Sequence, residues 1–134
     1  MRGDVAGQKK SDPRRERGHA GELSACRHLE ERGYHILETN YRSRYGEIDI
    51  IARRGELVAF VEVKARRGVR HGAPFEAVGP RKQNQIRRMA HMWVAAHQSD
   101  NSCRSCAFRF DVISIILDEA GGVKSLEHME DAFR

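Results

Sequence analysis

The sequence predicts an α/β domain whose mixed sheet of four or five strands is flanked by helices. Two apolar runs, residues 46–53 and 57–65, follow each other with a short polar break between them. Their near-continuous apolar character is typical of strands that are covered on both faces. Segments with helical periodicity precede and follow these runs, so helices are available for both faces.

The length of 134 residues fits one domain, which we assign to 14–134, after a polar segment over 1–13 that we expect to be disordered. No apolar run is long enough for a membrane span and the start does not resemble a signal peptide, so we expect a cytoplasmic protein. Three cysteines are an odd number and do not suggest a secreted disulfide framework. Cys103 and Cys106 make a single pair, which is too little to predict a zinc site.

A helix is predicted over 14–32, before a stop at Gly33. The apolar side chains on its face are Ala25, Cys26 and Leu29. Glu22 lies on this same face, because it precedes Ala25 and Cys26 by three and four residues. Its carboxylate either extends to water, as is usual for such a residue, or points into a site built by the strands that follow.

The three strands predicted next cover residues 34–41, 46–53 and 57–65. The turn of the second hairpin is expected at Arg54-Gly55, because Gly55 tolerates positive φ. Asp49 then lies opposite Phe60 and diagonal to Glu62. The side chains that share one face in this register are those of Glu47, Asp49, Glu62 and Lys64. A turn one residue longer or shorter would move Asp49 to the other face.

A helical turn at 74–78 precedes a second helix that begins at Pro80, whose fixed φ suits the first helical position. The apolar stripe of this helix comprises Ile86, Met89, Ala90, Trp93 and Val94, and we interpret it as plain core. A strand over 108–117 follows. It contains Asp111, which we interpret as a satisfied carboxylate at a sheet edge. A short edge strand over 123–129 ends the sheet.

Positive charge is concentrated directly after the hairpin. From Lys64 to Arg88 the chain has eight Lys or Arg residues and one acid, a net charge of +7 that exceeds the +5 of the whole chain. A basic segment next to a pair of acids suits a phosphodiester-binding site, and the alternative is an ordinary solvated surface. The residues that we expect to contact nucleic acid are Arg66, Arg67, Arg81, Lys82 and Arg88.

Asp49, Glu62 and Lys64 together suit the hydrolysis of a phosphodiester. Neighbouring carboxylates repel each other unless a cation neutralises them, and carboxylate oxygens prefer a hard ion such as Mg²⁺ or Mn²⁺. We therefore expect Asp49 and Glu62 to bind a metal that polarises the phosphate and helps to ionise a water molecule. Lys64 can orient that water or stabilise the transition state. The alternative for these residues is a cross-strand salt bridge.

Short motifs along the chain carry a family resemblance. They are Gly21-Glu22, Asn40-Tyr41-Arg42, Gly46-Glu47-Ile48-Asp49-Ile50-Ile51, Phe60-Val61-Glu62-Val63-Lys64, Lys82-Gln83 and Phe110-Asp111-Val112. This series resembles the YraN-like family of small bacterial proteins. That family is grouped with the restriction-endonuclease-like superfamily of PD-(D/E)xK nucleases and is akin to Holliday-junction resolvases. The resemblance extends from Arg17 to Phe133.

The resemblance implies a central mixed sheet with helices on both sides and a homodimer like that of the resolvases. It also implies that Asp49 and Glu62 bind the metal and that Lys64 is the catalytic lysine. Glu22 matches a glutamate of the first helix that accompanies the site, and Gln83 matches a polar residue often placed near it. Ile48 stands before Asp49 where the superfamily motif has proline.

Three functions are consistent with these residues. The first is a metal-dependent endonuclease that acts on structured or branched DNA. The second is a nucleic-acid-binding module without catalysis, whose binding would survive EDTA and would weaken steeply with salt. The third is a scaffold or partner-binding protein in DNA uptake or repair, for which the sequence offers no discriminating feature.

Overall fold

The computed structural model describes residues 13–68, 78–97 and 106–134, and the side chains from residue 19 onward within these ranges. Its elements are α1 (Pro13–Glu31), β1 (His35–Ser43), β2 (Gly46–Arg54), β3 (Leu57–Arg67), α2 (Pro80–Ala96), β4 (Ala107–Leu117) and β5 (Val123–Phe133). This order is the predicted one. β5 continues to Phe133 where a shorter strand was expected. Cys103 and most of the helical turn predicted over 74–78 lie outside the described residues.

The five strands form one sheet in the order β1-β2-β3-β4-β5. β3 and β4 are parallel, and the other neighbours are antiparallel, so the sheet is mixed as predicted. The parallel pair requires a crossover, and the segment that contains α2 provides it. β4 lies inside the sheet between β3 and β5. The prediction that Asp111 occupies an edge strand is therefore wrong.

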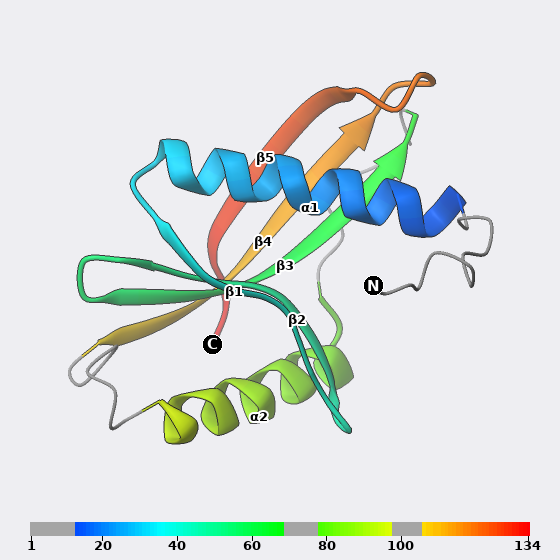
Figure 1. Cartoon of the computed structure of the whole chain (residues 1–134). Helices are drawn as coiled ribbons and strands as arrows, with labels where there is room; N and C mark the ends of the chain where they lie inside the picture. The colour runs from blue at the N-terminus through cyan, green and yellow to red at the C-terminus, as the bar shows by residue number, and fades with distance from the viewer. Residues whose placement is uncertain (1–12, 69–77, 98–105) are drawn as a thin grey trace, which may run out of the picture.

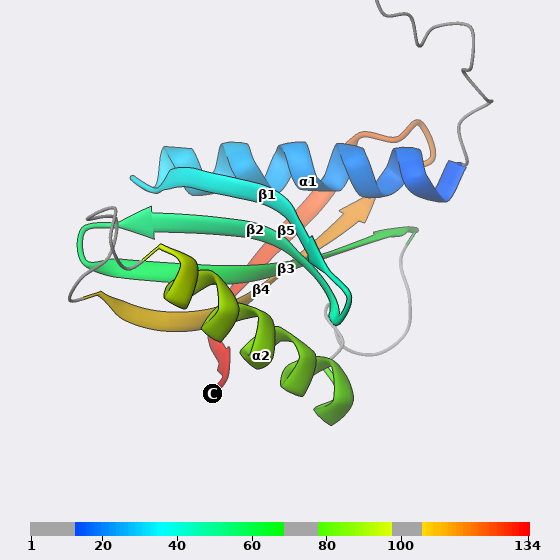
Figure 2. The ribbon, with the colours of Figure 1, turned by 60° about the horizontal axis from the view of Figure 1, so that its bottom comes forward.

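The two helices cover opposite faces of the sheet, as Figures 1 and 2 show. On one face, Leu29 of α1 packs with Ile50 and Val61. On the other, the α2 stripe around Trp93 packs with Phe60, which confirms that this stripe is core. Burial of each such side chain stabilises the fold by about 1.5–3 kcal/mol. The expected α/β class, with both faces of the sheet covered, is confirmed.

Gly21 allows α1 to lie close against β3. A Cβ atom at this position would be 2.8 Å from the Cβ of Ala65, a distance that real Cβ atoms do not reach. The helix can therefore approach this strand so closely only because residue 21 has no side chain. Glu22 follows directly, so this contact also determines where its carboxylate enters the molecule.

The turn between β2 and β3 lies one residue later than predicted, with Gly55 as its first residue at a φ of 61°. The pairs run from Arg54–Leu57 to Ile50–Val61, and Phe60 pairs with Ile51. The predicted position of Asp49 opposite Phe60 is therefore wrong. Asp49 and Glu62 nevertheless lie close together, because Asp49 Oδ2 accepts a hydrogen bond from the Val63 N–H and its charge raises the pKa of Glu62.

The alternation of side chains along β2 breaks at Asp49. Ile50 packs in the core under α1 and Ile51 in the core under α2, as alternation requires. Ile48 also packs under α2, although regular alternation would place it with Ile50. Across from this point, Asn40 of β1 has a φ of 54°, and the β1–β2 hairpin curves from here toward α2 (Figure 2). Asp49 therefore lies at a bend where groups from both faces can meet.

Candidate metal centre

Three carboxylates meet at this bend. Glu22 comes from α1, Glu47 and Asp49 come from β2, and one oxygen of each lies within 4.8 Å of the other two. This spacing approaches the roughly 4.2 Å between opposite ligands of an octahedral Mg²⁺ ion. Among the described residues, no other group of three or more Asp, Glu, His or Cys side chains is so placed. We refer to Glu22, Glu47 and Asp49 as the carboxylate cluster.

Glu47 belongs to the cluster but was not among the predicted site residues. The sequence carried a signal for it, since Glu47 and Asp49 are two residues apart on one strand. That spacing gives two acids on one side of a strand that is otherwise apolar. The resemblance assigns the metal to Asp49 and Glu62 and gives Glu47 no role.

Each carboxylate of the cluster is held by a hydrogen bond from a neighbouring group. The bonds are Asn40 Nδ2 to Glu22 Oε1 at 3.1 Å, the Val63 backbone N–H to Asp49 Oδ2 at 2.8 Å, and Arg42 Nε to Glu47 Oε2 at 3.3 Å. The bond to Asp49 comes from β3, so it ties the bend in β2 to its neighbouring strand. The orientation of all three carboxylates is thus set by protein groups.

Glu62 extends the site toward α2. Its side chain is only 12% exposed, and its Oε2 lies 3.7 Å from Lys82 Nζ. Its other oxygen, Oε1, is buried and accepts no hydrogen bond from the residues that the structure describes. A buried polar atom without a partner costs about 1–3 kcal/mol, and more when it is charged. A cation or a proton at Glu62 Oε1 would therefore stabilise the folded protein.

Electrostatics of the site reflect the crowding of acids. Burial and the neighbouring Asp49 raise the pKa of Glu62 to about 7, although Lys82 and Lys64 oppose this shift. Burial also raises the pKa of Asp49, partly offset by the hydrogen bond from the backbone of Val63. The pKa of Glu22 is raised by burial in the same way, and the charges of the cluster add to the effect. Protonation and cation binding thus compete for the same oxygens.

The predicted site residues Lys64 and Gln83 differ in their surroundings. Lys64 lies on β3 two residues beyond Glu62, close enough for its charge to lower the pKa of that acid. Gln83 donates its amide to the Val78 carbonyl at 2.7 Å and accepts a hydrogen bond from Arg87 at 3.0 Å. The α2 residue that reaches the acids is its neighbour Lys82.

The other predicted nucleic-acid contacts form two groups. Arg66 and Arg67 are the last residues of β3. Arg81 and Arg88 lie on α2 and line a pocket of about 450 Å³ between this helix and the tip of the β1–β2 hairpin. A Cβ atom at Gly46, which precedes Glu47, would lie 3.4 Å from Oε1 of Gln85, another residue of this pocket, so the pocket lies close to the strand that carries Glu47 and Asp49.

A second buried acid, Asp111 on β4, lies outside the carboxylate cluster. It is fully buried and accepts two hydrogen bonds from Arg109, both of 2.7 Å. His128 Nε2 lies 2.8 Å from its Oδ2, and the backbone N–H of Asp131 donates to its Oδ1 at 3.0 Å. Burial alone would raise the pKa of Asp111, but these donors outweigh it and hold the pKa below its usual range. The expectation that this carboxylate is satisfied is therefore confirmed.

The fold and the site together define an α/β protein with carboxylates gathered at a bend in a central strand, an arrangement consistent with a restriction-endonuclease-like fold. The chain belongs to the family described as "Uncharacterised protein family UPF0102", whose model matches residues 21–115. This is the YraN-like family that the motifs resemble. No described helix is long and apolar enough to cross a membrane.

Relatives from several organisms match most of the chain. A UPF0102 protein of Syntrophus aciditrophicus is 46% identical over 116 residues, which cover 87% of each chain. One from Trichlorobacter lovleyi is 45% identical over 117 residues, 87% of this chain and 88% of the relative. One from Dictyoglomus turgidum is 43% identical over 119 residues, 89% of this chain and 98% of the relative.

Proposed function

We propose that this protein is a divalent-metal-dependent endonuclease that hydrolyses phosphodiester bonds in structured or branched DNA. The observation that carries the proposal is the group of three carboxylates, with Glu62 beside its member Asp49; Oε1 of Glu62 is buried and has no hydrogen-bond partner among the residues that the structure describes. A protein gains no stability from crowded acids whose pKa values are raised by burial. Their retention at one bend of the sheet is therefore best explained by a ligand that they bind.

The donor set fits a hard divalent cation. Every candidate ligand is a carboxylate oxygen, which suits Mg²⁺ or Mn²⁺ and does not suit a thiolate-preferring metal. Glu22, Glu47, Asp49 and Glu62 are the residues that would hold it. A cation bound there would polarise a phosphate and lower the pKa of a water molecule.

The protein groups around these ligands have distinct roles in the proposal. The Val63 N–H keeps Asp49 in place and Asn40 keeps Glu22 in place. Lys82 neutralises the outer oxygen of Glu62 at 3.7 Å. Lys64, whose positive charge acts on Glu62, is suited to stabilise negative charge that develops on a phosphate.

The proposal is tested by cleavage of a labelled four-way DNA junction with Mg²⁺ or Mn²⁺. We expect wild-type protein to cut the junction, and Asp49→Asn, Glu62→Gln and Lys64→Met to lose roughly 10²–10³-fold in rate, since each removes a ligand or an electrostatic contact to the transition state. Glu127 is an exposed acid on β5, and the variant Glu127→Gln is the control for the loss of one negative charge. Equal cleavage by all preparations would identify a contaminant and would refute the proposal.

Metal binding can be measured separately from cleavage. Mn²⁺ at 100 times its dissociation constant should stabilise the wild-type fold by about 2.7 kcal/mol, because the ion binds the folded state only. Asp49→Asn should lose most of this gain in a thermal-unfolding experiment. No metal effect together with DNA binding that persists in EDTA would favour the non-catalytic nucleic-acid-binding module instead.

A further inference from the structure

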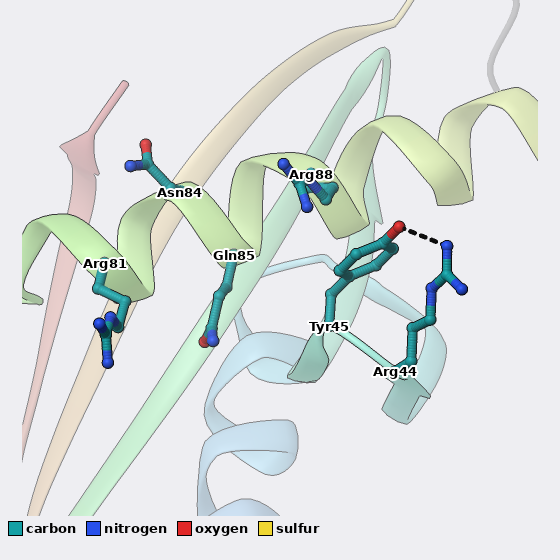
Figure 3. Close-up of a pocket in the computed structure, with 6 residues that line it drawn as sticks. All are labelled: Arg44, Tyr45, Arg81, Asn84, Gln85 and Arg88. Carbon is teal, nitrogen blue, oxygen red and sulfur yellow. Dashed lines mark hydrogen bonds between the residues drawn. The ribbon is translucent and has the colours of Figure 1, made fainter.

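The pocket beside the carboxylate cluster has an unusual lining. Its residues are Arg44 and Tyr45 from the tip of the β1–β2 hairpin and Arg81, Asn84, Gln85 and Arg88 from α2 (Figure 3). No carboxylate is among them. The volume of about 450 Å³ falls within the range of roughly 300–1,000 Å³ that is typical of small-ligand pockets.

The three arginines of this pocket carry uncompensated positive charge. None of them forms an ion pair with an acid in the described part of the chain, whereas Arg42, Arg109 and Arg134 each do. Holding like charges around one hollow is unfavourable unless an anion is bound there. The first turn of α2 adds to this preference, because it has no acidic residue and no side-chain cap from the described residues, and a helix N-terminus favours an anion.

Planar groups in the pocket offer a second kind of contact. The guanidinium carbons of Arg88 and Arg44 lie 4.7 Å and 5.0 Å from the centroid of the Tyr45 ring. Arg44 Nη2 also donates a hydrogen bond to the Tyr45 hydroxyl at 2.8 Å, as the dashed line in Figure 3 shows. Nucleobases stack on aromatic rings and on guanidinium planes, and the amides of Asn84 and Gln85 can bond to base edges.

We propose that this pocket binds one unpaired nucleotide of the DNA strand that the carboxylate cluster cleaves. The arginines would hold its phosphate, and Tyr45 with Arg88 would stack on its base. A base inside a duplex has both faces covered by its neighbours, so only an unpaired base can enter such a pocket. The inference rests on the proposed nuclease function and narrows its substrate to DNA with an unpaired nucleotide beside the cut.

The position of the pocket links it to the site. Tyr45 is followed in sequence by Gly46 and Glu47, and Arg81 is followed by Lys82, which lies 3.7 Å from Glu62. A strand that leaves the carboxylate cluster toward the hairpin tip therefore meets the three arginines next.

The test measures binding of fluorescein-labelled hexathymidylate to the full chain in EDTA, so that cleavage plays no part. Arg88→Gln should weaken binding roughly tenfold, because a charged contact to phosphate is lost. Tyr45→Leu should weaken it about 5- to 150-fold through lost stacking, and Tyr45→Phe should retain most of the affinity. Arg27→Gln, the same charge change at an exposed position on α1, is the matched control and should bind like wild type.

Equal weakening by Arg27→Gln and Arg88→Gln would show general attraction to a basic protein and would overturn the inference. An effect of Arg88→Gln without any effect of Tyr45→Leu would show a site for phosphate alone and would overturn it as well. The result is independent of the cleavage test. If hexathymidylate binds as expected but no preparation cuts DNA, the nuclease proposal fails. The proposal that the pocket binds an unpaired nucleotide is then still supported.

Discussion

Two buried carboxyl groups in this protein have opposite surroundings. Asp111 is fully buried and accepts hydrogen bonds from Arg109 and from the backbone of Asp131, with His128 also within hydrogen-bond distance. Glu62 is 12% exposed, has one distant lysine partner, and has one oxygen that no described residue contacts with a hydrogen bond. The pKa of Asp111 lies below its usual range, whereas that of Glu62 is raised to about 7.

The difference separates an acid that protein donors satisfy from one that is crowded by another acid. Burial disfavours the charged form of both side chains, so burial itself does not distinguish them. The distinction comes from the hydrogen-bond donors around each acid. A carboxylate that accepts several hydrogen bonds stabilises the fold, whereas a carboxylate next to another acid destabilises it. An acid that lowers stability and faces other acids is suited to bind a cation, and this contrast leads to four predictions about stability.

The largest effect is expected at Asp111. Asp111→Ala should lower the free energy of unfolding by about 3–5 kcal/mol, because it removes the acid closest to the largely buried Arg109 and leaves only the more distant Glu130 to pair with it. Urea denaturation measures this loss, and Asp111→Asn provides a milder variant if the alanine protein does not fold. Asp131→Asn, an acid in an exposed pair with Arg134, should change stability little. A comparably small loss at Asp111 would show that its hydrogen bonds do not stabilise the fold.

A smaller effect of opposite sign is expected at Glu62. In EDTA at pH 8, Glu62→Gln should be more stable than wild type by roughly 3 kcal/mol. The sign follows from the raised pKa: between about pH 4.5 and 7 the folded state keeps a proton that the unfolded state releases, so wild-type stability falls as pH rises through this range. Near pH 4 the gain from the substitution should disappear.

Asp111 should show the reverse pH dependence. Because its pKa is lowered in the folded state, its contribution is complete above its unfolded pKa and is lost as the pH falls below about 4. Urea denaturation of wild type, Glu62→Gln and Glu127→Gln across pH 3–8 measures both effects. A pH-independent difference between wild type and Glu62→Gln would contradict the account of that acid.

The smallest effect concerns the position of α1. One carboxylate of the cluster comes from α1, whereas all donors to Asp111 come from β4 and β5. Gly21→Ala should cost about 1–2 kcal/mol through overpacking against Ala65, and it should also weaken Mn²⁺ binding by displacing Glu22. The double variant Gly21→Ala/Ala65→Gly removes the clash and should recover Mn²⁺ affinity. Failure of the double variant to recover it would show that the helix contact does not position Glu22.

Much of the fold could be predicted, because the periodicity of apolar residues and the turn residues indicate its helices, strands and turns. The stripe around Trp93 has helical period, and the runs around Ile50 and Val61 are too apolar for a sheet with an exposed face. The turn at Gly55 was located to within one residue, since glycine tolerates its positive φ. The precise pairing was not predictable, because either of two adjacent turns satisfies the same local preferences.

The candidate site was less accessible to such reasoning. Asp49 and Glu62 stand out as acids within apolar strands, and alternation alone relates them. Glu47 was not predicted as a member of the carboxylate cluster. The hydrogen bonds that Asn40 and Val63 donate to acids have no signal in the sequence either, because they depend on a bend in β2 that no local pattern encodes. The pocket formed by Tyr45 and Arg88 joins two elements that are distant in sequence, so it could not be predicted either.

By itself the sequence determined the class of fold, the order of its elements, the charge of the basic segment and the acids that interrupt the apolar strands. Those features follow from periodicity and composition, which act over a few residues. Only the tertiary structure decided that Glu22 and Glu47 join Asp49, that one oxygen of Glu62 has no hydrogen-bond partner among the described residues, and that Asp111 is fully satisfied. These outcomes depend on how α1, β2 and β3 approach one another, and that geometry results from packing of the whole core.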